Sequence, residues 1–266
     1  MNFNKRFRVD LHNHTPLCNH AEGEPREYIK KAIEMGITHF GFSDHAPMLF
    51  DPDYRMSFDD MINYFDEVEK LKDEFKNEIE IFSALEVDYL PKYHDDRVIK
   101  SQTDYLIGSV HYLNEWGFDN PEFIGEYEHS DLDLLWEKYF FEIGKMAESG
   151  LFNIVGHFDL MKVFKFLPKK NRVEDLAEPT LRKIAKSGMV LEINGSGYRK
   201  PVKEPYPSLK ILEMAWDFKI PITFGSDAHS PNQVGLYHDQ IEQEAKRIGY
   251  REMAIFKNRK IEMIKF

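Results

Sequence analysis

The segment FRVDLHNH, residues 7–14, runs from a short apolar stretch into two histidines, and later parts of the chain repeat this pattern. His12 and His14 are two positions apart, so on an extended strand both imidazoles point to the same side. Further imidazole and carboxylate side chains end later β-type runs: His45, Glu86, His111, His157, Asp227 and His229. Divalent transition metals bind such side chains, and an α/β barrel gathers them at the carboxyl ends of its strands.

Seven runs with β character alternate with helical segments. Most of these runs are apolar on both faces, as in a parallel sheet covered by helices. We predict strands at residues 7–11, 39–43, 79–87, 104–111, 152–157, 189–194 and 220–225. We predict helices at residues 25–35, 57–76, 131–149, 173–187, 207–218 and 240–248, while 261–266 is too short to assign. The pattern favours a distorted or incomplete seven-stranded α/β barrel, with an open α/β sheet as the alternative.

The composition of the chain argues against membrane, secreted and nucleic-acid-binding proteins. We expect a single domain over residues 1–266, and no apolar run approaches the roughly 20 residues that cross a membrane. The first residues lack the apolar segment of a secretory signal. A single cysteine, Cys18, excludes an internal disulfide, so we expect a cytoplasmic protein. The net charge of −11, without a basic patch, disfavours a nucleic-acid partner.

Several residues need an individual interpretation. Glu86 follows a mostly apolar run, residues 81–85, and burying a lone carboxylate is costly, so a carboxylate that bridges two metals explains it best. His20 follows His14 in a loop that can fold back toward the strand end. We expect Cys18 to be a small buried residue rather than a ligand. Four histidines fall outside the pattern and are expected to be surface or packing residues: His39, His94, His129 and His238.

These motifs resemble the polymerase-and-histidinol-phosphatase (PHP) superfamily, and specifically its monofunctional histidinol-phosphate phosphatase branch. The resemblance is carried by DLHNHTPLCNHA (10–21), GFSDHAP (41–47), LEVDY (85–89), IGSVH (107–111), GHFDL (156–160) and GSDAH (225–229). It extends from residue 8 to about residue 238, which is nearly the whole chain.

The resemblance implies a distorted seven-stranded barrel with two to three divalent ions, which could be zinc, iron or manganese. By similarity, one ion would be held by His12, His14, Glu86 and Asp227. A second would be held by Glu86, His111 and His157, and a third by His20, His45 and His229. The implied activity is hydrolysis of L-histidinol phosphate in histidine biosynthesis, by attack of a metal-activated hydroxide on phosphorus.

The resemblance also directs attention to residues outside the ligand set. Candidates for protonating the leaving alcohol are Asp44, Asp227 and His229. Cationic candidates for binding the phosphate are Lys162, Arg199 and Arg55, although the family pattern leads us to expect Arg where Lys162 stands. Candidates for binding the substrate's ammonium and imidazole are Asp119, Asp159 and Glu115. The expected partner is a small phosphate monoester, and the protein is expected to be a monomer or homodimer.

Three alternatives stay open on the sequence. A nuclease or nucleotide phosphoesterase would use the same metal site but would need a basic track. An amidohydrolase-type enzyme also begins with H-x-H and ends with a strand aspartate, yet that class often bridges its metals with a carboxylated lysine, whose role Glu86 would fill here. A non-enzymatic metal-binding protein could keep a relict site, and the complete ligand set argues against it.

Overall fold

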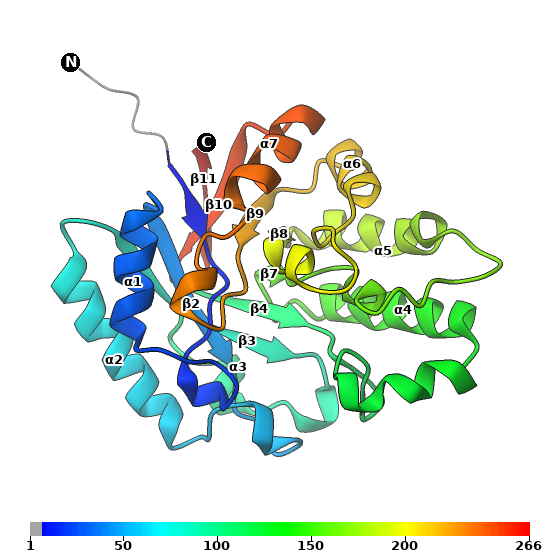
Figure 1. Cartoon of the computed structure of the whole chain (residues 1–266), viewed down its shortest axis with the longest axis horizontal. Helices are drawn as coiled ribbons and strands as arrows, with labels where there is room; N and C mark the ends of the chain where they lie inside the picture. The colour runs from blue at the N-terminus through cyan, green and yellow to red at the C-terminus, as the bar shows by residue number, and fades with distance from the viewer. Residues whose placement is uncertain (1–6) are drawn as a thin grey trace.

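Seven parallel strands form the central sheet, in the order in which they occur along the chain (Figure 1). The computed structural model describes residues 7–266. The strands are β1 (Val9–Asp10), β2 (His39–His45), β3 (Glu80–Asp88), β4 (Tyr105–Ser109), β7 (Ile154–Val155), β8 (Val190–Asn194) and β9 (Ile222–Gly225). Each pairs in parallel with the next, so all seven carboxyl ends face the same way.

The first and last strands meet, which nearly closes the sheet into a barrel. Between them the Leu11 amide donates to the Phe224 carbonyl at 2.9 Å, and Asn13 forms an isolated bridge with Ala228. The side chain of Asp10 accepts from the Ser226 amide and hydroxyl, at 2.8 and 2.6 Å. The prediction of a distorted seven-stranded barrel is therefore confirmed, and the chain does not form the open sheet.

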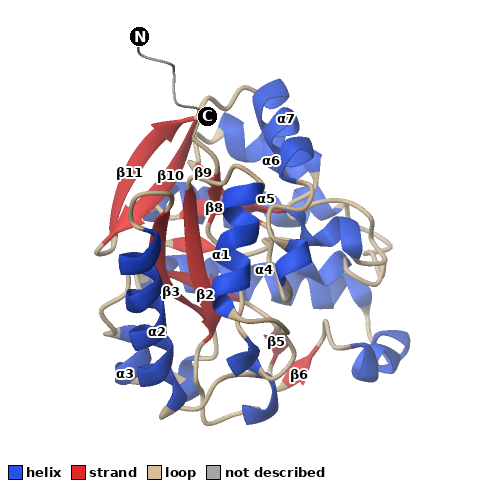
Figure 2. Ribbon diagram, turned by 60° about the vertical axis from the view of Figure 1, so that its left-hand side comes forward, coloured by secondary structure: helices blue, strands red, loops and turns tan. Residues whose placement is uncertain are grey.

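Helices cover the outside of the barrel, as Figure 2 shows. They are α1 (Pro25–Glu34), α2 (Asp60–Phe75), α3 (Asp96–Ile99), α4 (Leu132–Ser149), α5 (Val173–Ser187), α6 (Leu209–Asp217) and α7 (His238–Ile248). The glycines that stop three of them lie in the left-handed region, with φ of 71° at Gly36, 68° at Gly150 and 77° at Gly188. Among residues 7–266, no helix has both the length and the hydrophobicity of a membrane span.

The predicted elements agree with the structure except at their ends, in the short helix α3, which was not predicted, and in two hairpins. The helix expected from Ser57 begins at Asp60, whose amide donates to the Ser57 hydroxyl at 3.0 Å. The small hairpin β5 (Tyr112–Leu113) and β6 (Trp116–Gly117) was not predicted. Nor was the hairpin β10 (Glu252–Lys257) and β11 (Lys260–Lys265), which packs beside β9 through a 2.9 Å bond from the Thr223 hydroxyl to the Ala254 carbonyl.

The loops that leave the carboxyl ends of the barrel strands are ordered by short 3₁₀ turns. One turn lies in each loop: Pro16–Cys18, Pro52–Tyr54, Pro91–Tyr93, Pro121–His129, Leu160–Lys162, Gly195–Arg199 and Pro231–Gln233. Five of the seven begin with proline, whose ring fixes φ near the value that such a turn requires. The loops at this end of the barrel are therefore well ordered, and this end carries the residues that the sequence analysis identified as candidate ligands.

Candidate metal centre

Glu86, at the end of β3, lies at the centre of a buried cluster of imidazoles. Only 1% of its surface is exposed. Its two oxygens contact ring nitrogens of five histidines: His12 at 3.2 Å, His14 at 3.6 Å, His45 at 3.1 Å, His111 at 3.6 Å and His157 at 2.9 Å. The Ser109 hydroxyl donates to Glu86 Oε1 at 2.6 Å. The ends of four strands, β1, β2, β4 and β7, thus converge on a carboxylate carried by a fifth, β3.

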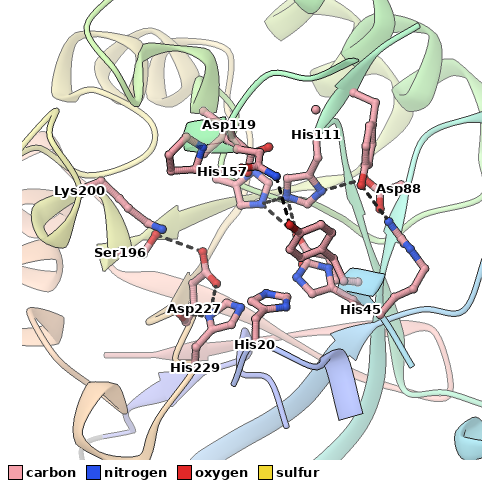
Figure 3. Close-up of a pocket in the computed structure, with 18 of the residues that line it drawn as sticks. His20, His45, Asp88, His111, Asp119, His157, Ser196, Lys200, Asp227 and His229 are labelled. Atoms are coloured by element: carbon pink, nitrogen blue, oxygen red, sulfur yellow. Dashed lines mark hydrogen bonds and ion pairs between the residues drawn. The ribbon is translucent and has the colours of Figure 1, made fainter. Parts of the chain in front are cut away.

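The cluster continues on the side of β9. Asp227 Oδ1 lies 3.2 Å from His14 Nε2 and 3.5 Å from His229 Nδ1. The His229 ring stacks on His14 with centroids 4.0 Å apart, and the His20 ring lies 4.7 Å from that of His229. Figure 3 shows His20, Asp227 and His229 on one side of the cluster and His111 and His157 on the other. The structure brings all nine predicted ligands together, and their role as ligands remains a prediction.

Several triplets have donor atoms close enough to share one ion, with all atoms of a triplet within 4.8 Å of one another. They include His12–His14–Asp227 and His12–Glu86–His157, and also His14–His45–His229 and Cys18–His20–His229. The first two triplets overlap with the first two predicted sites. In the second of them, His12 takes the place that the prediction gave to His111 beside Glu86 and His157. Cys18 is buried as expected, but its thiol lies nearer the cluster than the sequence indicated.

The donor set fits divalent cations. His12 Nε2 and His14 Nε2 are buried without a hydrogen-bond partner, and both face carboxylates. Buried polar atoms normally have such partners, so two unsatisfied ring nitrogens beside two carboxylates fit the binding of a cation. Imidazole nitrogen and carboxylate oxygen suit zinc, iron or manganese.

The electrostatics of the cluster keep its carboxylates ionised. Burial alone would raise the pKa of Glu86, but neighbouring His12, His45 and His111 hold it well below its usual value. The pKa of Asp227 is likewise held well below its usual value, against the effect of burial, by His12, His14 and His229. Both side chains therefore carry negative charge at neutral pH, as metal ligands must.

The imidazoles divide into two classes. Burial and the proximity of His14 lower the pKa of His45 and of His229 well below the usual value, so both offer free lone pairs at neutral pH. In contrast, although burial opposes it, Asp88 and Glu86 raise the pKa of His111 to about 10. The pKa values of His12 and His14 are also raised by carboxylates, against burial. A metal that binds these three must displace protons.

A second layer of carboxylates lies behind three of the imidazoles, and two of its three members, Glu192 and Asp88, were assigned no role from the sequence. His12 Nδ1 lies 2.7 Å from Glu192, and His111 Nδ1 lies 2.7 Å from Asp88. Asp88 is two residues beyond Glu86 on the same face of β3, and this spacing could have revealed it. Glu192 is the only acid within the apolar run of β8, and that also was a usable signal.

Asp44 belongs to the same layer, so the prediction that it could protonate the leaving group does not fit its position. It is fully buried behind His14, with Oδ1 3.3 Å from His14 Nδ1. Its oxygens also accept from the Thr15 hydroxyl, the Thr15 amide at 3.2 Å and the His45 amide at 2.8 Å. Asp44 does not line the pocket, whereas Asp227 and His229 do.

A pocket of about 480 Å³ opens above the cluster. Arg199 lines it; one guanidinium nitrogen donates to the carbonyls of Ser226 and Asp227 at 2.9 and 2.8 Å, and Nη1 is buried without a partner. Arg55 also lines the pocket, although it is 3% exposed and its Nη1 lies 3.0 Å from Asp88 Oδ2. Arg55 is therefore a buried partner of Asp88 rather than a surface arginine.

Lys162 does not line this pocket, and the expectation that it contacts the substrate does not fit its surroundings. Its ammonium is buried against three oxygens: Asp159 Oδ2 at 2.9 Å, Glu204 Oε1 at 2.9 Å and the Pro205 carbonyl at 2.7 Å. These contacts hold the loop after β7 to the segment before α6. Lysine satisfies this site because the three acceptors surround a point charge.

The three acidic candidates for binding an ammonium group differ in position. Asp119 lines the pocket. Asp159 is fully buried with Lys162 and with the Ser208 amide, 2.9 Å away. Glu115 lies on the surface, paired with Lys92 at 2.9 Å, outside this pocket. Of the three, only Asp119 can meet a ligand bound over the cluster.

Comparisons with known proteins identify a family and several similar proteins. The family model described as "PHP domain" matches residues 10–196, more than half of the 266-residue chain. A "Probable histidinol-phosphatase" of Deinococcus radiodurans is 39% identical, covering 95% of this chain and 98% of its own length. The "Histidinol-phosphatase" of Bacillus subtilis is 30% identical, covering 86% of this chain and 96% of its own length.

Solved structures share the fold. A histidinol phosphate phosphatase of Lactococcus lactis subsp. lactis, in complex with zinc, L-histidinol and phosphate, superposes with a TM-score of 0.80 at 23% identity. The superposition covers 96% of this chain and 98% of the other. A putative histidinol phosphatase of Listeria monocytogenes gives a TM-score of 0.76 at 25% identity, covering 88% of this chain and 99% of that one.

Proposed function

Because this chain belongs to the PHP domain family, we infer that it is a metal-dependent histidinol-phosphatase. It hydrolyses L-histidinol phosphate to L-histidinol and phosphate, a step of histidine biosynthesis. The observation that carries this conclusion is the 39% identity to a probable histidinol-phosphatase over nearly the full length of both chains. The complete set of nine clustered donors supports it, because a decayed site would have lost some of them.

We propose that these nine donors hold two to three divalent ions, with Glu86 shared between two of them. His12, His14, Glu86 and Asp227 would hold one ion, and His12 or His111 with Glu86 and His157 a second. His229 with His20 and His45 would hold a third. Zinc is the first metal to test, since the Lactococcus lactis structure contains it. Bound ions would supply an activated water at neutral pH and would neutralise charge on the phosphate.

The residues that reach the pocket can move the proton that the reaction requires. Asp227 is ionised at pH 7, so it is ready to accept a proton, whereas a His229 ring that holds an ion has no free lone pair. We propose that Asp227, through an oxygen that holds no ion, takes a proton from the attacking water and then passes it to the oxygen of the leaving alcohol. Asp44 would take no direct part, since it lies behind His14.

The charges around the pocket match a phosphate ester that also carries an amine. Arg199, with its unpaired Nη1, and Lys200 line one part of the pocket and would bind phosphate oxygens. Asp119 lines it as well and would pair with the substrate's ammonium or imidazole. A volume of about 480 Å³ accommodates a small substrate of this kind.

Phosphate release from metal-loaded protein tests the proposal. We expect faster release from L-histidinol phosphate than from p-nitrophenyl phosphate, and no turnover after Glu86→Gln. The matched control is Glu115→Gln, because Glu115 lies outside the pocket and its variant should retain activity. Equal rates on both monoesters would exclude histidinol phosphate as the substrate. Cleavage of oligonucleotides that outpaces both would favour the nuclease alternative.

A further inference from the structure

The strand β8 ends in Asn194 and supplies none of the nine donors, yet it places a carboxylate against two of them. Glu192 lies in the middle of this strand and is 1% exposed. Its Oε1 lies 2.7 Å from His12 Nδ1, and its Oε2 accepts from the His157 amide at 2.8 Å. Both oxygens of this buried carboxylate are therefore engaged by residues of the cluster.

The neighbouring strand leaves room for this arrangement. A Cβ atom at Gly225 of β9 would lie 2.2 Å from Glu192 Oε1 and 2.7 Å from His12 Cβ. Neither contact is possible without displacement, so any larger residue at position 225 would push the carboxylate and the imidazole apart. The absence of a side chain at Gly225 is thus a condition of the bond between Glu192 and His12.

The two contacts of Glu192 lead to members of one candidate metal site. His12 and His157 belong with Glu86 to a single triplet of donors. His157 follows β7, which pairs with β8 on one side, and His12 follows β1, which meets β9 on the other side of β8. We propose that Glu192 is a positioning residue of the metal centre, which fixes the His12 ring and the His157 main chain so that the triplet converges. This inference rests on the proposed function, because it assumes that the triplet holds a metal.

The physical basis is the choice of ring nitrogen that carries the proton. When Glu192 accepts a hydrogen bond from His12 Nδ1, the lone pair of a neutral imidazole is left on Nε2, and Nε2 faces Glu86 at 3.2 Å. His12 Nε2 has no hydrogen-bond partner in the structure, as expected of an atom reserved for a cation. Glu192 therefore acts on the metal through His12, without contacting it.

The substitution Glu192→Gln tests this role because it changes one oxygen into a donor while keeping the shape. The His157 amide can only donate, so it will hold the remaining oxygen. The new NH₂ group then faces His12 Nδ1, which must become an acceptor. The ring proton moves to Nε2, where it blocks the metal. We expect zinc affinity at one site to fall about 10- to 100-fold, with kcat reduced and KM for the substrate little changed.

The matched control is Glu242→Gln in α7. Glu242 is also a glutamate with 1% exposure, but its charged partner is Lys246 at 2.7 Å, away from the pocket. This variant should lose stability without losing zinc affinity. A second variant, Gly225→Ala, should reproduce the zinc defect of Glu192→Gln by displacing the same carboxylate.

Nitrogen NMR of the zinc-loaded wild-type protein gives a test that needs no variant. We expect the proton of His12 on Nδ1 and zinc on Nε2; a proton on Nε2 would overturn the proposal. Unchanged zinc affinity in folded Glu192→Gln would also overturn it. If the wild-type protein binds no zinc, iron or manganese, the proposed function itself fails. If the wild type binds metal and Glu192→Gln binds it equally well, only the role of Glu192 fails.

Discussion

Replacing Arg55 with methionine will show whether this arginine binds substrate or holds the metal centre in shape. Its guanidinium donates to four oxygens: the Asp51 carbonyl at 2.8 Å, Asp88 Oδ2 at 3.0 Å, the Tyr112 hydroxyl at 3.2 Å and the Ala46 carbonyl at 3.3 Å. Asp88 in turn holds His111 Nδ1 at 2.7 Å. Methionine fills much of the volume but leaves one oxygen of a buried carboxylate without its cation.

The expected loss of stability follows from this contact. Breaking a buried ion pair costs about 3–5 kcal/mol, and we expect about 3 kcal/mol because His111 still pairs with Asp88. An unfolding entropy of roughly 2.1 cal/mol/K per residue gives about 0.56 kcal/mol/K for 266 residues. The melting temperature of the metal-free protein should therefore fall by about 5 °C. Calorimetry in the presence of a chelator measures this change without the effect of metal binding.

Activity should respond in the same variant. A loosened Asp88 no longer fixes the His111 ring, so metal occupancy and kcat should fall by about 10- to 100-fold. Arg55→Lys is the matched control, since it keeps the charge but loses the planar fork, and it should show a smaller effect on both measurements. A variant with wild-type melting temperature and kcat but a raised KM would refute this reasoning and would return Arg55 to the phosphate-binding candidates.

Three further predictions concern charge and pH. Burial and the nearby Arg8 lower the pKa of His238 to about 4, below its unfolded value of about 6.5, so the unfolded chain binds more protons between these values. The free energy of unfolding should therefore fall by about 2 kcal/mol from pH 7 to pH 5, and His238→Gln should remove that part of the pH dependence. Denaturant unfolding at both pH values measures it, and an equal fall in the wild type and in the variant would contradict this account. Zinc binding near pH 7 should release protons and weaken on acidification, because three ligands have raised pKa values: His12, His14 and His111. Calorimetric titrations in buffers of different ionisation enthalpy count these protons, and a buffer-independent heat would argue against this account. Finally, Asp119→Asn should reduce kcat/KM for histidinol phosphate but not for p-nitrophenyl phosphate, and an equal loss on both would exclude a role in binding the amine.

Sequence reasoning succeeded where the information is local. Most predicted ligands lie at the end of an apolar run, so the position of Glu86 at a strand end could be predicted without knowing what surrounds it. The barrel followed from the count and alternation of such runs. The hairpin of β10 and β11 escaped because the segment 260–265 alternates charged and apolar residues over too short a length to be assigned alone.

The residues that sequence reasoning missed depend on partners far away in the chain. The role of Glu192 becomes visible only with His12, which is 180 positions away. Lys162 was assigned to the substrate because Glu204, one of its partners, lies on another loop, and no local pattern joins the two. Asp44 was considered catalytic for the same reason, since only the fold reveals that His14 stands between it and the pocket.

The contact between β1 and β9 has a consequence for how the protein responds to its surroundings. These strands lie more than 200 residues apart in sequence and share an isolated bridge instead of a regular ladder. His12 and His14 stand on one side of this seam, and Asp227 stands on the other, 3.2 Å from His14. An ion held by all three would cross-link the ends of β1 and β9, where the barrel closes. At a free concentration 100 times its dissociation constant, it would add about 2.7 kcal/mol to the stability of the whole fold. The melting temperature of this protein would then rise with the concentration of free metal ion around it.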